Sequence, residues 1–358
     1  MEPVNPEIAR ARTLDAAFYI DPEWLKRIRE EVFVPSWQFV GDESVVGELG
    51  CCYPFDLLPG FLDEPLLLTR DQEGLHCLSN VCTHRGNIII SDPCKASHLK
   101  CSYHGRHFAL NGRFRSMPEF KEVENFPSAS DDLPMLPLFK WGPMLFTSLS
   151  RKHGFEPFFG DMINRVGWLP ISDFVFRPEF SRTFHVKANW ALYCENYLEG
   201  FHIPFVHAGL NAVIDYGNYT TELFHYANLQ VGIAKDDEAC FDLPPGTPDH
   251  GKKVAAYYFF VFPNMMFNFY PWGLSVNIVE PNGLEQTKVR FLTYVWKEEL
   301  FNTGAGSDLD TVEYEDEEVV ENVQRGVRSR FYSHGRYSVT REQGTHHFHM
   351  MISSFLKL

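Results

Sequence analysis

The spacing of apolar residues divides the chain into a short helical start, a strand-rich middle and a mixed final part. Residues 21–32 open with Asp-Pro-Glu and continue with apolar residues at helical spacing, which predicts a helix. Between residues 37 and 146, short apolar runs such as 65–69 and 76–78 are separated by glycine, aspartate and proline, as in a small all-β domain. We therefore expect the first large unit to consist of short strands.

The part of the chain after residue 177 predicts an α+β domain. Residues 190–206 have the composition of a helix that is distorted near Pro204. Strands are predicted at 257–262, 274–279 and 289–296, and the Pro-Asn-Gly sequence between the last two is a good turn signal.

A helix near the C-terminus carries an acid on its apolar face. At about 100° per residue, one stripe of this helix collects five apolar side chains. These are Val319, Val320, Val323, Val327 and Phe331. Asp316 lies near the middle of the stripe, whereas Glu315, Glu317 and Glu318 lie off it and are expected to face water. Because burying an unpaired charge is costly, Asp316 needs a partner or a ligand.

Composition excludes several classes of protein. The 358 residues are 44% apolar and include 32 phenylalanines, so the chain is long enough for two domains with large cores. The net charge of −15 is the opposite of a nucleic-acid binder's basic footprint. Residues 1–16 lack the apolar core of a signal peptide, and the apolar stretch 254–272 contains proline and asparagine, which suits strands better than a membrane helix. We expect a cytoplasmic protein that binds neither nucleic acid nor a membrane.

Two short motifs each combine one cysteine with one histidine. The sequence NVCTHRG contains Cys82 and His84, and CSYHG contains Cys101 and His104. Two thiolates and two imidazoles can hold a [2Fe–2S] cluster, with the cysteines on one iron and the histidines on the other. Replacing two thiolates by neutral imidazoles lowers the negative charge at the cluster and raises its reduction potential, which suits an electron relay.

A structural zinc site is the main alternative for these four residues, because Cys2His2 also binds zinc. Zinc sites usually pair cysteine with cysteine in each knuckle, and chance pairing among 8 cysteines and 15 histidines rarely repeats a mixed motif. In the absence of a secretory signal, metal ligation also explains the cysteines better than disulfides do. The residues therefore favour the iron–sulfur cluster.

A second group of candidate ligands follows in the sequence ENYLEGFHIPFVH. His202 and His207 are five residues apart, so a regular helix would place them on different faces. Pro204 lies between them and disrupts the helix, so an irregular turn can aim both rings at one point. With a carboxylate, for which Asp316 is our choice, they would form a 2-His-1-carboxylate iron site. Taken alone, each residue has an ordinary explanation as a core histidine or a helix cap.

Glu199 precedes His202 by three residues, so the two side chains are neighbours on a helix. It is interpreted either as an ordinary exposed glutamate or as a bridge, hydrogen-bonded to His202 and to a cluster histidine of another subunit. This segment by itself leaves both interpretations open.

Together the two groups resemble those of the Rieske non-haem iron oxygenase α-subunits, over about residues 37–355. The pattern acid-x-x-His-x-x-x-x-His is matched by Glu199, His202 and His207. A glutamate at 199, where many ring-hydroxylating members carry aspartate, is similar to the choline monooxygenase and quaternary-ammonium branch. The segment Gln324-Arg325-Gly326 and the late sequence HHFH are also similar to that branch.

The resemblance implies an α+β protein with an N-terminal helical segment at 1–36 and an all-β Rieske [2Fe–2S] domain at 37–155. A helix-grip catalytic domain, with an antiparallel sheet and a long C-terminal helix, is implied at 156–358. It further implies a homotrimer in which the cluster of one subunit reduces the iron of its neighbour. The chain departs from the family at Ser102 and Arg106, where many members have proline and tryptophan, and this changes the contacts around the cluster.

Residue by residue, the resemblance assigns four cluster ligands, three ligands of a mononuclear Fe(II) and one electron-transfer bridge. These are Cys82, His84, Cys101 and His104, then His202, His207 and Asp316, and finally Glu199. The implied enzyme takes electrons from a separate NAD(P)H-dependent flavin and iron–sulfur reductase and uses O₂ to oxidise a small molecule.

Two substrates are consistent with the sequence. The first is a quaternary ammonium compound hydroxylated next to its nitrogen, often ending in N-demethylation, and held by aromatic faces. The candidate cage is Phe201, Phe205, Phe267, Phe269, Tyr270 and Trp272, although the same residues suit a phenylalanine-rich core. The second is an aromatic ring, as in the ring-hydroxylating dioxygenases. A cation site is expected to include an acid or a carbonyl near the cage, and an arene site is not.

A function of another class is a Rieske electron carrier or a metal-binding protein without oxygenase activity. The second group of ligands argues against it, because a carrier has no use for an open-sided iron site.

Overall fold

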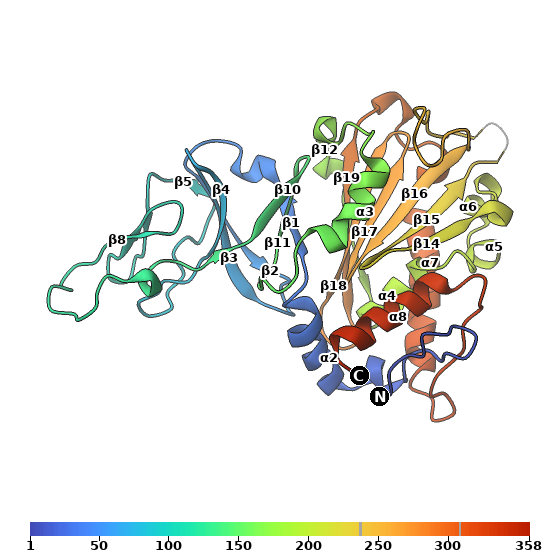
Figure 1. Ribbon diagram of the computed structural model, residues 1–358, viewed down its shortest axis with the longest axis horizontal. Helices are drawn as coiled ribbons and strands as arrows, with labels where there is room; N and C mark the ends of the chain where they lie inside the picture. The colour runs from blue at the N-terminus through green and yellow to red at the C-terminus, as the bar shows by residue number, and fades with distance from the viewer. Residues whose placement is uncertain (236–237, 308) are drawn as a thin grey trace. The chain divides into compact units, whose positions relative to one another are not determined.

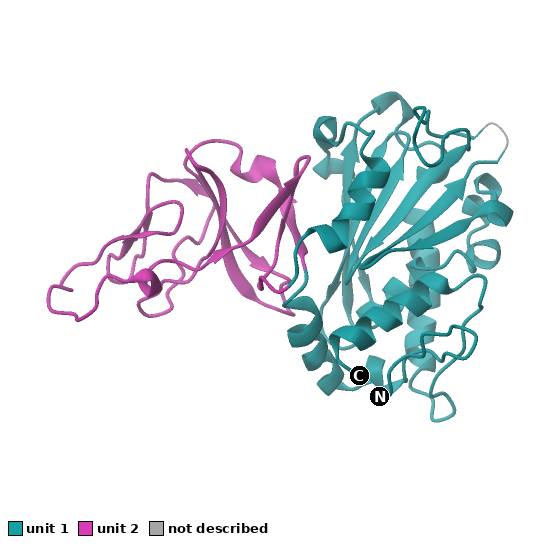
Figure 2. Ribbon diagram, in the orientation of Figure 1, with its two compact units in different colours: residues 1–36, 153–358 teal, residues 37–152 magenta. Residues whose placement is uncertain are grey.

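The computed structural model describes residues 1–235, 238–307 and 309–358, which form two compact units (Figures 1 and 2). Residues 37–152 form the smaller unit, and residues 1–36 with 153–358 form the larger one. The break after residue 152 lies near the expected boundary at 155. Residues 1–36 fold as part of the larger unit instead of forming a segment of their own.

The smaller unit is built from short antiparallel strands, as predicted. The apolar runs at 65–69 and 76–78 lie in two paired central strands of a five-stranded sheet. In spatial order that sheet is β5 (Cys94–Lys95), β2 (Cys51–Leu57), β3 (Glu64–Asp71), β4 (Gly74–Ser79) and β9 (Met135–Leu136). Two three-stranded sheets complete the unit. They are β1 (Gln38–Asp42), β11 (Met144–Thr147) and β10 (Leu138–Trp141), and β6 (Leu99–Lys100), β7 (His107–Phe108) and β8 (Phe114–Ser116).

The larger unit contains an eight-stranded antiparallel sheet. Its main path runs β12 (Val175–Phe176), β19 (Thr287–Val295), β18 (Gly273–Pro281), β17 (Met265–Tyr270), β16 (Val254–Val261), β15 (Ala227–Ile233) and β14 (Thr220–Leu223), and β13 (Arg182–Val186) also pairs with β19. The predicted turn joins β18 to β19 at residues 281–283, where Gly283 has a φ of +108° that favours glycine.

Helices cover both faces of this sheet (Figure 1). Their bounds are α1 (Ala17–Ile20), α2 (Pro22–Ile28), α3 (Glu156–Val166), α4 (Trp190–Tyr197), α5 (Ile203–Val206), α6 (Ala208–Val213), α7 (Leu309–Gly326) and α8 (Gln343–Phe355). Phe159 of α3 packs on Phe267 of β17, while Tyr197 of α4 donates a hydrogen bond to Asn268, the next residue of that strand. Since successive strand side chains point to opposite faces, α3 and α4 lie on opposite sides of the sheet.

The predicted N-terminal helix is confirmed as α2. Asp21 caps it by accepting a hydrogen bond from the Glu23 amide at 2.9 Å, and Pro22 occupies the first turn. A π-helical turn continues the helix over Arg29–Phe33, and Phe33 packs edge-on against Trp190 at 5.0 Å. This contact explains why the N-terminal residues belong to the larger unit.

Strands β14 and β15 were not predicted from the sequence. In β15, the fully buried side chains of Asn228 and Gln230 interrupt the apolar pattern. Asn228 bonds to His347 and to the Gly344 carbonyl, so hydrogen bonds replace the water these groups lose. Because these polar residues break the apolar run, the hydrophobicity pattern did not predict the strand.

The apolar stripe predicted near the C-terminus needs a correction. Helix α7 ends at Gly326, so Phe331 lies beyond it and is 94% exposed, and Val323 is 43% exposed. The buried face is instead rotated toward Glu313 and Gln324, with Val320 between them. The side chains of α7 that are buried are those that pack against its neighbours, and the neighbouring helix α4 provides polar partners for them.

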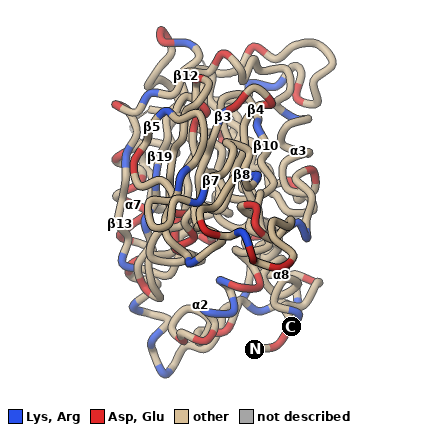
Figure 3. Tube along the Cα trace, turned by 90° about the vertical axis from the view of Figure 1, so that its left-hand side faces the viewer, with Lys and Arg blue, Asp and Glu red and all other residues tan. Residues whose placement is uncertain are grey.

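Acidic residues outnumber basic ones in this chain, 47 to 32. In the view of Figure 3, lysines and arginines lie among the aspartates and glutamates along the trace. None of the helices in the described residues is both long and apolar enough to cross a bilayer.

Candidate metal centres

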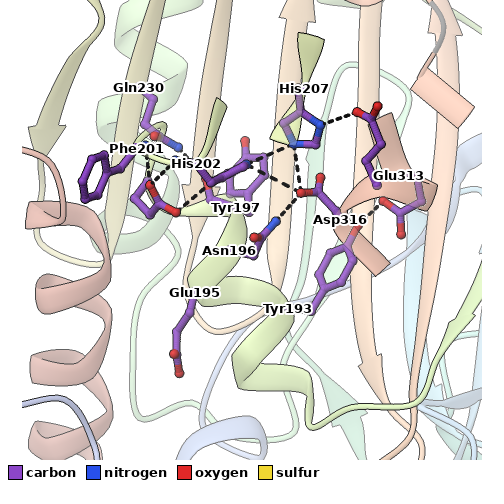
Figure 4. A network of polar contacts seen from close by, with 12 residues as sticks. Tyr193, Glu195, Asn196, Tyr197, Phe201, His202, His207, Gln230, Glu313 and Asp316 are labelled. Carbon is purple, nitrogen blue, oxygen red and sulfur yellow. Dashed lines mark hydrogen bonds and ion pairs between the residues drawn. The ribbon is translucent and has the colours of Figure 1, made fainter. Parts of the chain in front are cut away.

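Side chains from two segments that are distant in sequence meet at one point in the larger unit (Figure 4). The Nε2 atoms of His202 and His207 lie 3.1 Å apart, and Asp316 Oδ1 lies 3.0 Å from His207 Nε2 and 3.6 Å from His202 Nε2. One donor atom from each residue lies within 4.8 Å of the others. Two imidazole nitrogens and one carboxylate oxygen that converge in this way are the donor set of a divalent metal ion.

The chain reaches this geometry by breaking a helix. Helix α4 ends at Tyr197, His202 precedes the short helix α5, and His207 separates α5 from α6. Pro204 occupies the first turn of α5, where its missing N–H costs nothing. Gly200 is required in the turn, because a Cβ there would lie 2.6 Å from the Tyr219 ring. The predicted irregular turn between the two histidines is confirmed.

Each of the two imidazoles is oriented by a carboxylate at its Nδ1 atom. Glu199 Oε1 lies 2.8 Å from His202 Nδ1, and Glu315 Oε2 lies 2.7 Å from His207 Nδ1. Burial alone would lower the pKa of His207, but hydrogen bonds with Asp316 and Glu315 outweigh it and leave the pKa raised. A carboxylate that holds the Nδ1 proton turns the Nε2 lone pair toward a metal. The expectation that Glu315 faces water is therefore wrong.

Sequence reasoning also missed Glu313. Its side chain is 2% exposed, and Oε2 accepts a hydrogen bond from the Tyr193 hydroxyl at 2.5 Å. Burial raises the pKa of Glu313 well above its usual range, and the nearby Asp316 adds to this. Helical periodicity could have identified Glu313, because this residue lies one turn before Asp316. It was missed because the apolar stripe was defined by valines.

Asn196 holds Asp316 in place. Its Nδ2 donates to Asp316 Oδ1 at 2.5 Å, and the residue belongs to α4, the helix that precedes the two histidines. Helix α4 is itself tied to α7 at its start, where Gln324 Oε1 accepts from the Asn189 amide at 2.8 Å. The two helices therefore position the carboxylate and the histidines against each other.

A pocket opens beside His202, His207 and Asp316. About 110 Å³ inside it is open to the centres of water-sized molecules, so it has room for a small ligand. Five tyrosines contribute to the lining, namely Tyr193, Tyr197, Tyr219, Tyr258 and Tyr270. Gln230, Asn268 and Asn277 contribute amides from neighbouring strands. Buried polar side chains on central strands indicate a binding surface instead of ordinary core.

Only Tyr270 of the six candidate cage residues lines this pocket. Phe201 and Phe205 are 41% and 80% exposed, so they are surface residues. Phe267 and Phe269 are buried, but the strand pleat directs them to the face opposite Asn268 and Tyr270. Trp272 stacks on Tyr270 at 5.2 Å in the hydrophobic core and does not line the pocket. Five of the six candidate cage residues therefore lie outside the lining of this pocket.

The smaller unit brings the two Cys-His motifs together. The amide of Cys82 donates to the Asn87 carbonyl at 2.8 Å, and the amide of Cys101 donates to the Arg106 carbonyl at the same distance. A glycine follows the histidine in each motif, and both glycines have a φ of +71°. The two loops are thus structural copies, which explains why the same mixed motif occurs twice.

The side chains of these loops fit an iron–sulfur cluster. The ring centroids of His84 and His104 lie 4.6 Å apart, and Cys82 and Cys101 are both buried in the same core cluster. The Nδ1 atoms of both histidines are buried without a hydrogen-bond partner among the described residues. Buried nitrogen lone pairs without a partner are costly, and coordination by iron satisfies them.

Arg106, where the resemblance implies a tryptophan, is a buried cation. It is 2% exposed, pairs with Asp131 at 2.6 Å and lies over the Phe114 ring at 4.9 Å. Burial opposes ionisation of Asp131, but hydrogen bonds from Ser128 and Arg106 leave its pKa lowered. The positive charge of Arg106 is therefore paired, so an arginine can be buried at this position.

Comparisons with known proteins agree with this architecture. Residues 56–127 match the model of the Rieske [2Fe-2S] domain, and residues 176–357 match the ring hydroxylating alpha subunit (catalytic domain). Choline monooxygenase of Arabidopsis thaliana is 31% identical over 98% of this chain and 84% of its own length. The carnitine monooxygenase oxygenase subunit of Escherichia coli is 28% identical over 99% of this chain and 96% of its own.

Solved structures share the fold. The quaternary ammonium Rieske monooxygenase CntA in complex with L-carnitine superposes with a TM-score of 0.75 at 24% identity, over 98% of this chain and 97% of that one. Naphthalene 1,2-dioxygenase from Rhodococcus sp. superposes with a TM-score of 0.72 at 17% identity, over 95% and 94%.

A Rieske domain joined to a catalytic domain with an open-sided metal site defines an oxygenase. The chain belongs to the Rieske non-haem iron oxygenase family. As a member of that family it is an enzyme whose cofactors are a Rieske [2Fe–2S] cluster and a mononuclear iron. The interpretation as an electron carrier is thereby set aside.

Proposed function

We propose that the protein is the oxygenase component of a system that hydroxylates a small quaternary ammonium compound at a carbon next to its nitrogen. The observation that carries this proposal is the pocket, which combines five tyrosines with the buried carboxyl group of Glu313, an acid that neither holds the iron nor supports an iron ligand. Tyrosine faces and an acid attract a cation, and an arene has no use for the acid. The names of its relatives, choline and carnitine monooxygenases, support the same substrate class.

The proposal assigns each centre its ligands. Cys82, His84, Cys101 and His104 hold the cluster, and His202, His207 and Asp316 hold the iron. When bound, the cluster supplies single electrons and the iron supplies the site of O₂ chemistry. Glu199 and Glu315 keep the imidazole Nδ1 protons, which leaves both Nε2 atoms available. The tyrosines position the substrate, and the sheet beneath them excludes water.

The overall reaction balances with two electrons. One oxygen atom of O₂ enters a C–H bond of the substrate, and the other leaves as water after uptake of two electrons and two protons. The proposal therefore includes a separate NAD(P)H-dependent flavin and iron–sulfur reductase as the electron donor. It also includes a homotrimer, in which Glu199 connects His202 to a cluster histidine of a neighbouring subunit. A cytoplasmic location fits the eight free thiols.

Substrate-dependent O₂ consumption tests the proposed function. Purified holoenzyme with a surrogate reductase and NADH is expected to consume O₂ with choline, carnitine or a related trimethylammonium compound, with formation of the hydroxylated or demethylated product. Naphthalene and similar arenes are expected to give no product. Arene hydroxylation without turnover of any cation would support the ring-hydroxylating dioxygenase instead.

Replacing Glu199 by glutamine tests the proposed bridge. The glutamine oxygen can still accept the His202 Nδ1 proton, so the iron is expected to stay bound. Turnover is expected to fall by about 10- to 100-fold, a size usual for groups that support metal ligands. Single-turnover EPR is expected to show a cluster that remains reduced after substrate and O₂ are added. If iron content falls in proportion to activity, Glu199 only supports the iron site.

A further inference from the structure

The buried carboxyl group of Glu313 has no neutralising partner in its pocket. Tyr193 occupies Oε2, while Oε1 is buried with no hydrogen-bond partner among the described residues. The nearest charged neighbour on α7 is another acid, Asp316. None of the described residues that line the pocket is lysine or arginine. An unsatisfied buried carboxyl is costly, which indicates that the pocket is completed by a ligand.

The surroundings of Glu313 favour a cation as that ligand. Tyr193 holds the carboxyl, and Tyr197 and Tyr270 contribute to the same lining. Aromatic faces attract an ammonium group most strongly where water is excluded. A second buried oxygen in the lining, Oε1 of Gln230, is also an acceptor without a partner in the described part of the chain. An acceptor suits a hydroxyl or ammonium group and repels a carboxylate.

The charges of the iron site lead to the same conclusion. An iron(II) ion held by two neutral imidazoles and the single carboxylate of Asp316 keeps a net charge of about +1. That charge opposes the approach of a cationic substrate. Of the two other acids in the lining, Glu199 is bonded to His202, and the carboxylate of Glu313 is left to cancel that charge. A nearby cation in turn favours the ionised form of a buried acid.

We propose that Glu313 is the counter-ion that selects a cationic substrate without a carboxylate. The inference rests on the proposed function. It adds the residue that recognises the positive charge, and it limits the substrates to cations without a carboxylate. A choline-like cation supplies the positive charge that the carboxylate of Glu313 lacks. A betaine-like zwitterion brings a carboxylate for which the described lining provides no lysine or arginine. Glu313 is therefore a specificity-determining residue that acts on binding.

Calorimetry on the anaerobic holoenzyme tests this without turnover. The probes are choline, its neutral carbon analogue 3,3-dimethylbutan-1-ol, and glycine betaine. The wild-type protein is expected to bind choline at least about 10-fold more tightly than either of the others. Glu313→Gln is expected to weaken choline binding by about 30-fold or more, the size usual for removing one partner of a buried charge pair, and to leave the analogue unchanged.

Matched variants separate charge from packing. Glu318→Gln removes an acid from the exposed face of α7 and is expected to change no affinity. Glu313→Asp keeps the charge and is expected to keep the preference for choline over its analogue. Iron content and the EPR signal of the reduced cluster confirm that each variant remains a holoenzyme.

Three outcomes would overturn the inference in distinguishable ways. If Glu313→Gln binds choline as the wild type does, or loses choline and the analogue equally, Glu313 is not the counter-ion and the proposed function stands. If glycine betaine binds as tightly as choline, the limit on carboxylates is wrong. If wild-type protein neither binds these cations nor consumes O₂ with them, the proposed function fails as well.

Discussion

Replacement of Asp316 by alanine is expected to remove the mononuclear iron and abolish substrate oxidation while leaving the Rieske cluster intact. Among the described residues, Asp316 is the carboxylate that reaches both histidine Nε2 atoms, at 3.0 and 3.6 Å. Two neutral imidazoles alone bind Fe(II) weakly, because carboxylate oxygen supplies the charge and the third facial position. Iron content is expected to fall from about three to about two per chain, the two of the cluster.

The cluster and a neighbouring acid provide the controls for Asp316→Ala. The EPR spectrum of the dithionite-reduced cluster is expected to match that of the wild type, since the substitution lies in the larger unit. Glu318→Ala removes an exposed acid from the same helix and is expected to retain both iron and activity. Full iron content in Asp316→Ala would show that another acid, with Glu315 or Glu313 the nearest candidates, completes the site.

Replacement of Cys101 by serine is the second change with a large expected effect. Serine keeps the shape of a side chain that is 1% exposed and packed in the core of the smaller unit, but its oxygen is a poor substitute for a thiolate on iron. The cluster is expected to be lost, together with its visible absorption, its EPR signal and all reductase-dependent turnover. The mononuclear iron is expected to remain, at about one per chain.

Cys94→Ser is the matched control for this experiment. Cys94 belongs to the same unit but is exposed on strand β5, and nothing in the sequence pairs it with a histidine. It is expected to keep the cluster and full activity. A zinc content that replaces iron in the wild-type protein, with no EPR signal after reduction, would contradict the cluster assignment itself.

The cluster residues could be predicted because their pattern is local. Each motif lies within one short loop, and the loops need a thiol, an imidazole and a glycine at fixed spacing. The same holds for the break between His202 and His207, since Pro204 disrupts a helix wherever it stands in one. Asp316 is distant in sequence but was found from helical periodicity, which places an acid on a face that other residues bury.

The pocket could not be predicted in the same way. Phe267 and Tyr270 lie in one apolar run, and only the direction of the strand pleat decides which of them faces the pocket. A shift of one residue in that register would exchange the two faces. Glu313 and Glu315 differ in the same manner, because the rotation of α7 against α4 decides which acid is buried and which reaches His207.

The sequence by itself determined the class of this protein, since the ligand types and their spacing dictate which metals and cofactors can bind. It also determined the strand-rich first unit and the hairpin near residues 281–283. The tertiary structure alone decided what surrounds the iron site, namely five tyrosines, four amides and an unpaired buried acid. The physical reason is that coordination chemistry acts through short motifs, whereas the shape and charge of a cavity arise from side chains that only the packed sheet and helices bring together.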